Sequence, residues 1–216
     1  MTAPHTDQSY TALLDEVVAS QRALESTLET LTDQQAREPS RLAGWSRGHV
    51  VTHLARNADA LNRFAVGVIT GEPAPEMYPG GPAARAAAIE EGAGRPVELL
   101  AADFRFAGRR VIDSLREITA DRYETPVNWR KPVTAWDVPV LRWRELEIHH
   151  VDLGLDHAVG DWPEAFVDNT LATELPELKA LHPDVTIPEL PRHELLAWLI
   201  GRPTRTGLPS VPAWPF

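Results

Sequence analysis

Four long stretches of this chain repeat apolar residues every three or four positions, and this helical periodicity limits the possible folds more than any other feature. The stretches cover residues 10–31, 46–69, 96–118 and 138–153. Ser46 is well suited to cap the second helix, and Gly154 to end the fourth. Four amphipathic helices, with one long connection between the second and the third, predict a mainly α fold built on a four-helix bundle.

The segments between and after these stretches complete the predicted organisation. Residues 70–82 (TGEPAPEMYPGGP) form a proline- and glycine-rich loop, which is followed by a short alanine-rich helix over 83–91. Residues 124–139 predict an extended connection with a short hairpin. Two further helices are expected at 163–181 and 191–200, with a strand at 184–188 (DVTIP). We therefore expect a bundle over residues 1–158 and a small C-terminal α/β domain over residues 159–216.

Composition and charge exclude several classes of partner. The formal net charge is −10 and no basic run is present, so a nucleic-acid partner is not expected. No apolar stretch approaches the ~20 residues needed to cross a bilayer. The opening MTAPHTDQSY lacks the basic and apolar regions of a signal peptide. A soluble cytoplasmic protein is expected, and a monomer is compatible with this organisation because the C-terminal part could cover one end of the bundle.

Two of the predicted helices carry histidines and glutamates at helical spacing. Residues three or four apart share one helix face, which gives the pairs His49–His53, Glu145–His149 and Glu147–His150. A carboxylate and imidazole nitrogens from facing helices are a suitable donor set for a divalent ion. Adjacent histidines point about 100° apart, so at most one histidine of the fourth helix faces the bundle axis. Spacing alone leaves open which pair is used, and hydrogen-bonded core or surface roles are the alternative for each residue.

The cysteine, histidine and tryptophan residues of the chain further limit which side chains can take part in a reaction. The chain contains no cysteine, so a thiol that takes part in any reaction has to come from outside. The remaining histidines fall outside the two paired blocks and are expected to be structural or solvent-exposed: His5, His157, His182 and His193. Three tryptophans near the motifs are expected to act as packing anchors: Trp45, Trp143 and Trp198.

The blocks GWSRGHVVTHLARNADAL (44–61) and LRWRELEIHHVDLGL (141–155) together resemble the mycothiol-dependent maleylpyruvate isomerases, which are DinB-like four-helix metalloproteins. The segment LLAWLIGR (195–202) is similar to the C-terminal domain of that family. The resemblance implies a zinc ion held by His53, Glu145 and His149. It also implies that Glu147 and His150 face elsewhere, and that His49 is a neighbour of the site and not a ligand.

The resemblance further implies a reaction, the zinc-dependent cis–trans isomerisation of maleylpyruvate to fumarylpyruvate in gentisate degradation, with mycothiol as the nucleophile. The partners would then be a small dicarboxylate and a low-molecular-weight thiol. Three protein ligands would leave a fourth zinc position open, as in catalytic sites. Arg202 would bind a substrate carboxylate, although an arginine there could equally satisfy carbonyls at a helix end. Asp152 could orient His149, or cap the helix, or meet solvent.

Two alternatives use the same bundle. The first is a mycothiol-dependent S-transferase, whose product would retain the sulfur. The second is a metal-binding or purely structural bundle without enzymatic activity. Two histidines and one carboxylate also suit nickel or iron(II), so the donor set indicates a divalent ion more firmly than it indicates zinc.

Overall fold

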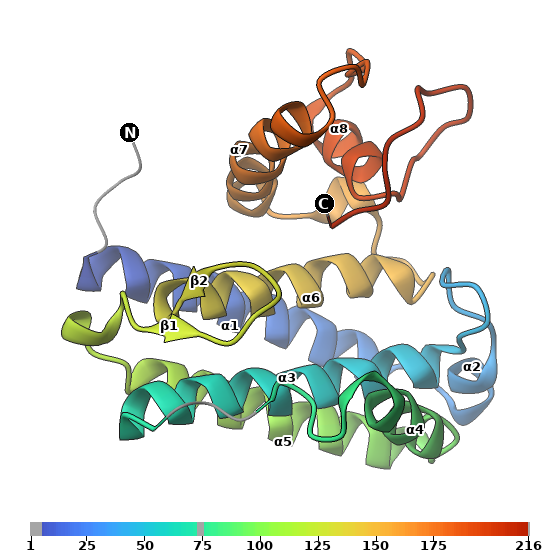
Figure 1. Ribbon diagram of the computed structural model, residues 1–216. Coiled ribbons are helices and arrows are strands. Elements are labelled where there is room, and N and C mark those ends of the chain that lie inside the picture. The colour runs from blue at the N-terminus through green and yellow to red at the C-terminus, as the bar shows by residue number, and fades with distance from the viewer. Residues whose placement is uncertain (1–5, 73–75, 216) are drawn as a thin grey trace. The chain divides into compact units, whose positions relative to one another are not determined.

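The computed structural model describes residues 6–72 and 76–215, and the chain divides between Gly154 and Leu155 into two compact units (Figure 1). The first unit contains the four long helices α1 (Asp7–Glu29), α3 (Arg47–Thr70), α5 (Val97–Arg116) and α6 (Val138–Asp152). Two short helices, α2 (Asp33–Arg37) and α4 (Gly81–Ala93), lie in the connections. The predicted mainly α, DinB-like bundle is confirmed, whereas α2 was not predicted. None of the described helices has the length and apolarity needed to span a bilayer.

The directions of the four long helices follow from contacts between their ends. The Tyr10 hydroxyl at the start of α1 donates to the carbonyl of Leu115 at the end of α5, at 3.2 Å. Arg47 Nε at the start of α3 donates to the carbonyl of Leu153 just after α6, at 2.8 Å. Arg122, after α5, donates to the Ile69 carbonyl near the end of α3, at 3.0 Å. Because α3 and α5 therefore run in parallel, the chain between them must return along the bundle, and this crossover carries α4.

Local sequence explains where the helices begin and end. The Ser46 side chain accepts a hydrogen bond from the His49 backbone N–H and caps α3, as predicted. Gly154, with φ +66°, follows the end of α6. The apolar face of α3 is fully buried at Val50, Leu54 and Phe64, so this helix forms the centre of the core. Of the predicted loop 70–82, residues 73–75 lie outside the described residues.

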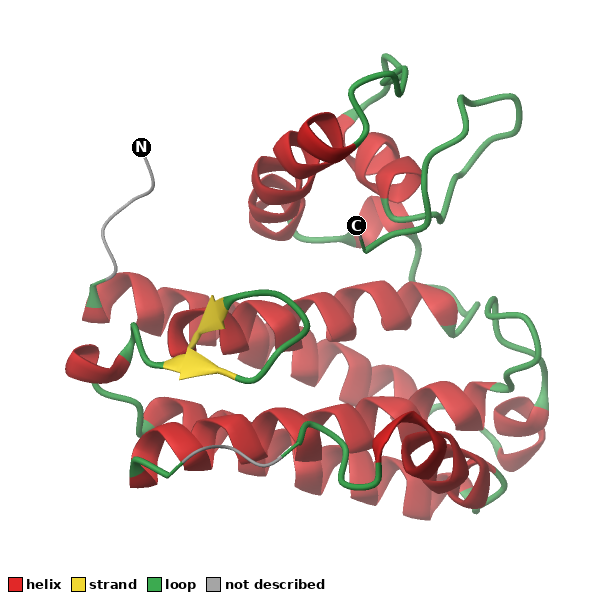
Figure 2. Cartoon of the chain, viewed as in Figure 1, coloured by secondary structure: helices red, strands yellow, loops and turns green. Residues whose placement is uncertain are grey.

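The hairpin expected before α6 is confirmed. Strands β1 (Pro126–Val127) and β2 (Val133–Thr134) pair in antiparallel register, and they are the only strands among residues 6–72 and 76–215 (Figure 2). The strand expected at 184–188 is wrong, so the predicted α/β character of the C-terminal part is not found in residues 155–215. Val185 and Ile187 suit a strand, but between Pro183 and Pro188 they have no neighbouring strand to pair with.

The second unit, residues 155–215, contains α7 (Glu164–Leu181) and α8 (Arg192–Leu199), which correspond to the two predicted helices. Trp198 is buried, as expected of a packing residue, and its indole N–H donates to the Pro209 carbonyl at 2.7 Å. The indole of Trp214 donates to the buried Glu174 carboxylate at 2.7 Å. These two bonds attach the non-helical C-terminal segment to the helices of its own unit.

Candidate metal centre

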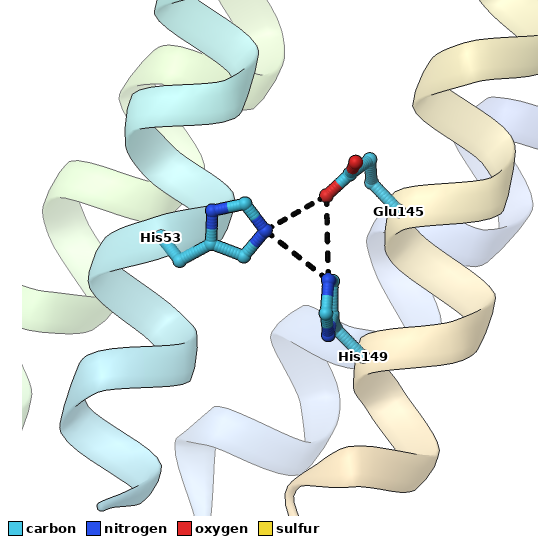
Figure 3. Close-up of side chains that lie close together, drawn as sticks. All are labelled: His53, Glu145 and His149. Atoms are coloured by element: carbon cyan, nitrogen blue, oxygen red, sulfur yellow. Dashed lines mark hydrogen bonds and ion pairs between the residues drawn. The ribbon is translucent and has the colours of Figure 1, made fainter. Parts of the chain in front are cut away.

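Three side chains from two helices converge between α3 and α6 (Figure 3). His53 lies in the second turn of α3, whereas Glu145 and His149 lie one turn apart on one face of α6. His53 Nε2 is 2.8 Å from Glu145 Oε2 and 3.1 Å from His149 Nε2, and these last two atoms are 3.4 Å apart. The structure thus brings together the three residues that the family resemblance implies as ligands.

The shape of this triangle suits a tetrahedral cation. Ligand atoms held about 2.0–2.2 Å from a zinc ion lie about 3.3 Å from one another. The three separations observed here are 2.8, 3.1 and 3.4 Å, so only small side-chain movements would be needed to surround an ion. The donor set of two imidazole nitrogens and one carboxylate oxygen is also one that zinc accepts. The residues therefore fit a divalent metal.

Burial and charge set the protonation of the three groups. The His53 side chain is 5% exposed, and burial lowers the pKa of its imidazole. Partial burial opposes ionisation of Glu145, but the two adjacent imidazoles outweigh it and hold the pKa of this carboxyl well below its ordinary value. Burial also disfavours the charged form of His149, yet Asp152 and Glu145 outweigh it and raise its pKa to about 9. The centre therefore contains a carboxylate that stays ionised at neutral pH.

Asp152 contacts the ring nitrogen of His149 that does not face His53 and Glu145. Its Oδ2 lies 2.8 Å from His149 Nδ1, and the carboxylate is almost fully buried. A carboxylate can only accept, so Nδ1 carries a proton, and when the ring is neutral its lone pair is on Nε2, which faces His53 and Glu145. Carboxylate–histidine pairs of this kind orient metal ligands in many sites. Of the alternatives left open by the sequence, the structure shows the contact with His149.

The other titratable residues of the two blocks lie elsewhere. Glu147 accepts a hydrogen bond from the Ser20 hydroxyl of α1, and His150 Nε2 lies 2.7 Å from Thr27 Oγ1, also on α1. His49 is used at the N-terminus of α3, where its Nδ1 lies 3.1 Å from the Ser46 backbone nitrogen. None of these three has a ligand atom in the triangle formed by His53, Glu145 and His149.

The remaining predicted residues are placed as follows. In the second unit, Arg202 Nη1 donates to the carbonyl of Ile200, which caps α8, at 2.9 Å. His193 Nε2 lies 2.9 Å from the Trp162 carbonyl oxygen. His157 and His182 also belong to this unit, and His5 lies outside the described residues. Trp143 is buried against α1, where its indole donates to Ser20 Oγ at 3.0 Å.

Three residues around the centre were not predicted to belong to it. Arg85 of α4 places Nη2 3.0 Å from His53 Nδ1, and its guanidinium carbon lies 5.3 Å from the centre of the Tyr78 ring. Trp45 was expected only to pack, but it is half-buried with its ring centroid 5.6 Å from that of His53. Burial and the charge of Glu145 raise the pKa of Tyr78. Arg85 is a single arginine in an alanine-rich helix, so no repeating pattern in the sequence could have shown that it lies beside His53.

Comparison with known proteins agrees with this geometry. Residues 17–154 match the family model described as the mycothiol maleylpyruvate isomerase N-terminal domain. A crystal structure of the mycothiol-dependent maleylpyruvate isomerase is 26% identical, with a TM-score of 0.82 over 95% of this chain and 97% of that one. A structure of a histidine-to-alanine mutant of the isomerase is 25% identical, with a TM-score of 0.81 and the same coverage. No curated protein matches. Because the family model covers more than half of the chain, the chain belongs to the family of the mycothiol maleylpyruvate isomerase N-terminal domain.

Proposed function

We propose that this protein is a zinc-dependent isomerase that converts maleylpyruvate to fumarylpyruvate with mycothiol as the thiol. The observation that carries the proposal is the convergence of His53, Glu145 and His149 on one point, in a chain whose fold and family are those of such isomerases. The side chains of Glu145 and His149 are 25% and 15% exposed, so the α6 side of the centre has partial contact with solvent.

The protein's own residues would prepare the centre for a cation. His53, Glu145 and His149 would hold it, and Asp152 would keep the proton of the neutral His149 ring on Nδ1, which leaves Nε2 to bind the cation. When bound, a zinc ion lowers the pKa of a thiol that it coordinates, which makes a thiolate available near neutral pH. The chain has no cysteine, so no thiol of its own would compete with mycothiol.

The proposed reaction needs only a reversible bond between sulfur and carbon. The thiolate sulfur adds to one carbon of the cis double bond, and the displaced electron pair moves onto the conjugated carbonyl as an enolate. The resulting carbon–carbon single bond rotates. The enolate then re-forms the double bond in the trans geometry and expels the thiolate, so that mycothiol is regenerated. No oxidant or reductant is needed.

The decisive experiment combines metal analysis with a turnover assay. Protein purified without an affinity tag should contain about one zinc ion per chain, and should isomerise maleylpyruvate only when mycothiol is added. The His53→Ala variant should lose both the metal and the activity. A zinc-loaded protein that forms a stable thioether product instead would support the S-transferase alternative. A protein that contains no stoichiometric metal would contradict the proposal.

Several finer assignments stay predictions. Arg202 is proposed to bind a carboxylate of the substrate, which an Arg202→Gln variant tests: KM for maleylpyruvate should rise while zinc content stays unchanged. An unchanged KM would contradict this role for Arg202. A cytoplasmic location and a monomeric state are likewise predictions from the sequence.

A further inference from the structure

Close packing between two helices brings Arg85 to the metal centre. A Cβ atom on Gly48 of α3 would lie 2.2 Å from the carbonyl oxygen of Ala93 in α4, and a Cβ on Gly92 would lie 2.5 Å from Thr52 Cγ2. Only glycine permits so close an approach. The last turn of α4 therefore rests on the α3 turns beside His53, and Arg85, two turns earlier on α4, reaches the far side of the His53 ring.

The contact between Arg85 and His53 fixes where the imidazole carries its proton. A guanidinium group only donates hydrogen bonds, so His53 Nδ1 has to be the acceptor at 3.0 Å. The single proton of the neutral ring is then on Nε2, from which Glu145 Oε2 accepts at 2.8 Å.

Binding of a cation reverses this arrangement. A metal ion at Nε2 needs the lone pair of that nitrogen, so the proton of the neutral ring moves to Nδ1. Two donors, Nδ1–H and the guanidinium, would then face each other across 3.0 Å, and the contact cannot persist. The N–H group that faced His53 would then lack an acceptor, and a carboxylate matches the geometry of a guanidinium with two parallel hydrogen bonds.

We propose that Arg85 binds a carboxylate of the substrate beside the metal centre, and that occupation of the centre by zinc releases Arg85 from His53 for this role. The inference rests on the proposed function, since it takes the substrate to be a dicarboxylate. Tyr78 supports the role, because its ring lies under the guanidinium and limits the positions that Arg85 can adopt after release.

Binding of maleate tests the assignment without turnover, because maleate carries two carboxylates on a cis double bond and cannot react when no thiol is present. Calorimetric titration would compare zinc-loaded wild type, Arg85→Gln, Arg85→Lys and the control Arg109→Gln, which changes an exposed arginine of α5. Loss of a charge-assisted hydrogen-bonded pair should weaken maleate binding by about 10- to 100-fold in Arg85→Gln. Arg85→Lys should fall between, and Arg109→Gln should match wild type. Equal affinity in wild type and Arg85→Gln, or no maleate binding by zinc-loaded wild type, would overturn the proposal.

The release step has its own readout in wild type. Long-range ¹⁵N–¹H spectra should show the His53 proton on Nε2 in metal-free protein and on Nδ1 after zinc is added. A proton already on Nδ1 without metal would contradict the release.

The outcomes also separate this inference from the proposed reaction. If maleate binding depends on Arg85 but maleylpyruvate is not isomerised, the reaction is wrong and the binding role of Arg85 stands. If maleylpyruvate is isomerised but Arg85→Gln binds maleate as wild type does, only the role of Arg85 is wrong.

Discussion

Helix α6 carries two similar pairs of residues on two of its faces, and they have different surroundings. The face toward α3 holds Glu145 and His149, which meet a third ionisable side chain, His53, and are partly open to solvent. The face toward α1 holds Glu147 and His150, which are buried and hydrogen-bonded to the hydroxyls of Ser20 and Thr27. In both pairs the residues are three or four positions apart, so each pair lies on one face of the helix.

The difference shows that the partner helix decides what a glutamate–histidine pair does. On the α1 side, the hydroxyls of Ser20 and Thr27 form separate hydrogen bonds with Glu147 and His150, and among the described residues the ligand atoms of this pair do not converge with a third one. The imidazole from α3 instead adds a third donor atom to a carboxylate and an imidazole, which is the arrangement that a cation can complete. Three predictions test this contrast and a fourth tests the packing of α1 against α5, and they are ordered from the largest expected effect to the smallest.

The strongest contrast compares Glu145→Gln with Glu147→Gln. Loss of a residue that supports a ligand typically weakens metal binding by about 10- to 100-fold. Glu145→Gln removes a direct ligand, so it should weaken zinc binding by more than this. Glu147→Gln should bind zinc as wild type does, because its carboxylate faces α1. Competition with a chromophoric chelator measures both affinities. Similar losses in the two variants would remove the distinction between the faces.

The next prediction concerns Asp152, which contacts His149 and so supports the face of α6 that lies toward α3. Asp152→Ala removes the acceptor for His149 Nδ1 and should weaken zinc binding by about 10- to 100-fold. Asp152→Asn keeps an acceptor oxygen and should lose less. The same chelator competition applies, with circular dichroism to verify the helical content. An unchanged affinity in Asp152→Ala would show that His149 needs no orienting partner.

The α1 side should respond in stability and not in metal binding. Ser20→Ala removes one hydrogen-bond partner from each of Glu147 and Trp143, both buried. Loss of partners by buried polar groups should lower the free energy of unfolding by about 1–3 kcal/mol. Urea denaturation measures this change, and the zinc affinity of the folded variant should equal that of wild type. A large loss of zinc affinity would mean that the two faces are coupled.

The smallest effect lies at the far end of α1 and depends on pH. The Tyr10 hydroxyl donates to the Leu115 carbonyl, and burial together with Tyr123 raises the pKa of Tyr10 above its ordinary value. Because the folded-state pKa lies above the unfolded value of about 10, the contribution of Tyr10 is intact below pH 10 and lost as the pH rises further. Tyr10→Phe should cost about 1 kcal/mol at pH 7 and reduce the loss of stability between pH 9.5 and 11. Urea denaturation across this range measures both, and parallel curves for the two proteins would contradict the assignment.

The sequence predicted the long elements of the fold because they depend on local patterns. Apolar periodicity located all four bundle helices, and the Ser46 cap is confirmed. The five-residue helix Asp33–Arg37 is too short to show a period. The strand expected at 184–188 failed for the opposite reason: β-branched residues were present, but a strand exists only if a second one lies beside it, which a local pattern cannot reveal.

The candidate site was predictable only where the chain carried a motif. His53, Glu145 and His149 came from the resemblance, because helical spacing alone allowed Glu147 and His150 equally well. Arg85 could not be found in this way. Its position depends on glycines 48 and 92 letting α3 and α4 approach, and that is a property of two helices packed together and not of either sequence alone.

The parallel course of α3 and α5 has a consequence for engineering. Since the chain must travel back between these helices, the segment that supplies Arg85 is separate in sequence from both helices that supply the metal ligands. Exchanging residues 76–96 between relatives would therefore replace the proposed carboxylate-binding residue and leave His53, Glu145 and His149 in place, provided that the glycine at position 92 is kept against Thr52. If Arg85 binds a substrate carboxylate as proposed, variation in that segment would change substrate binding without changing the three residues that would hold the cation.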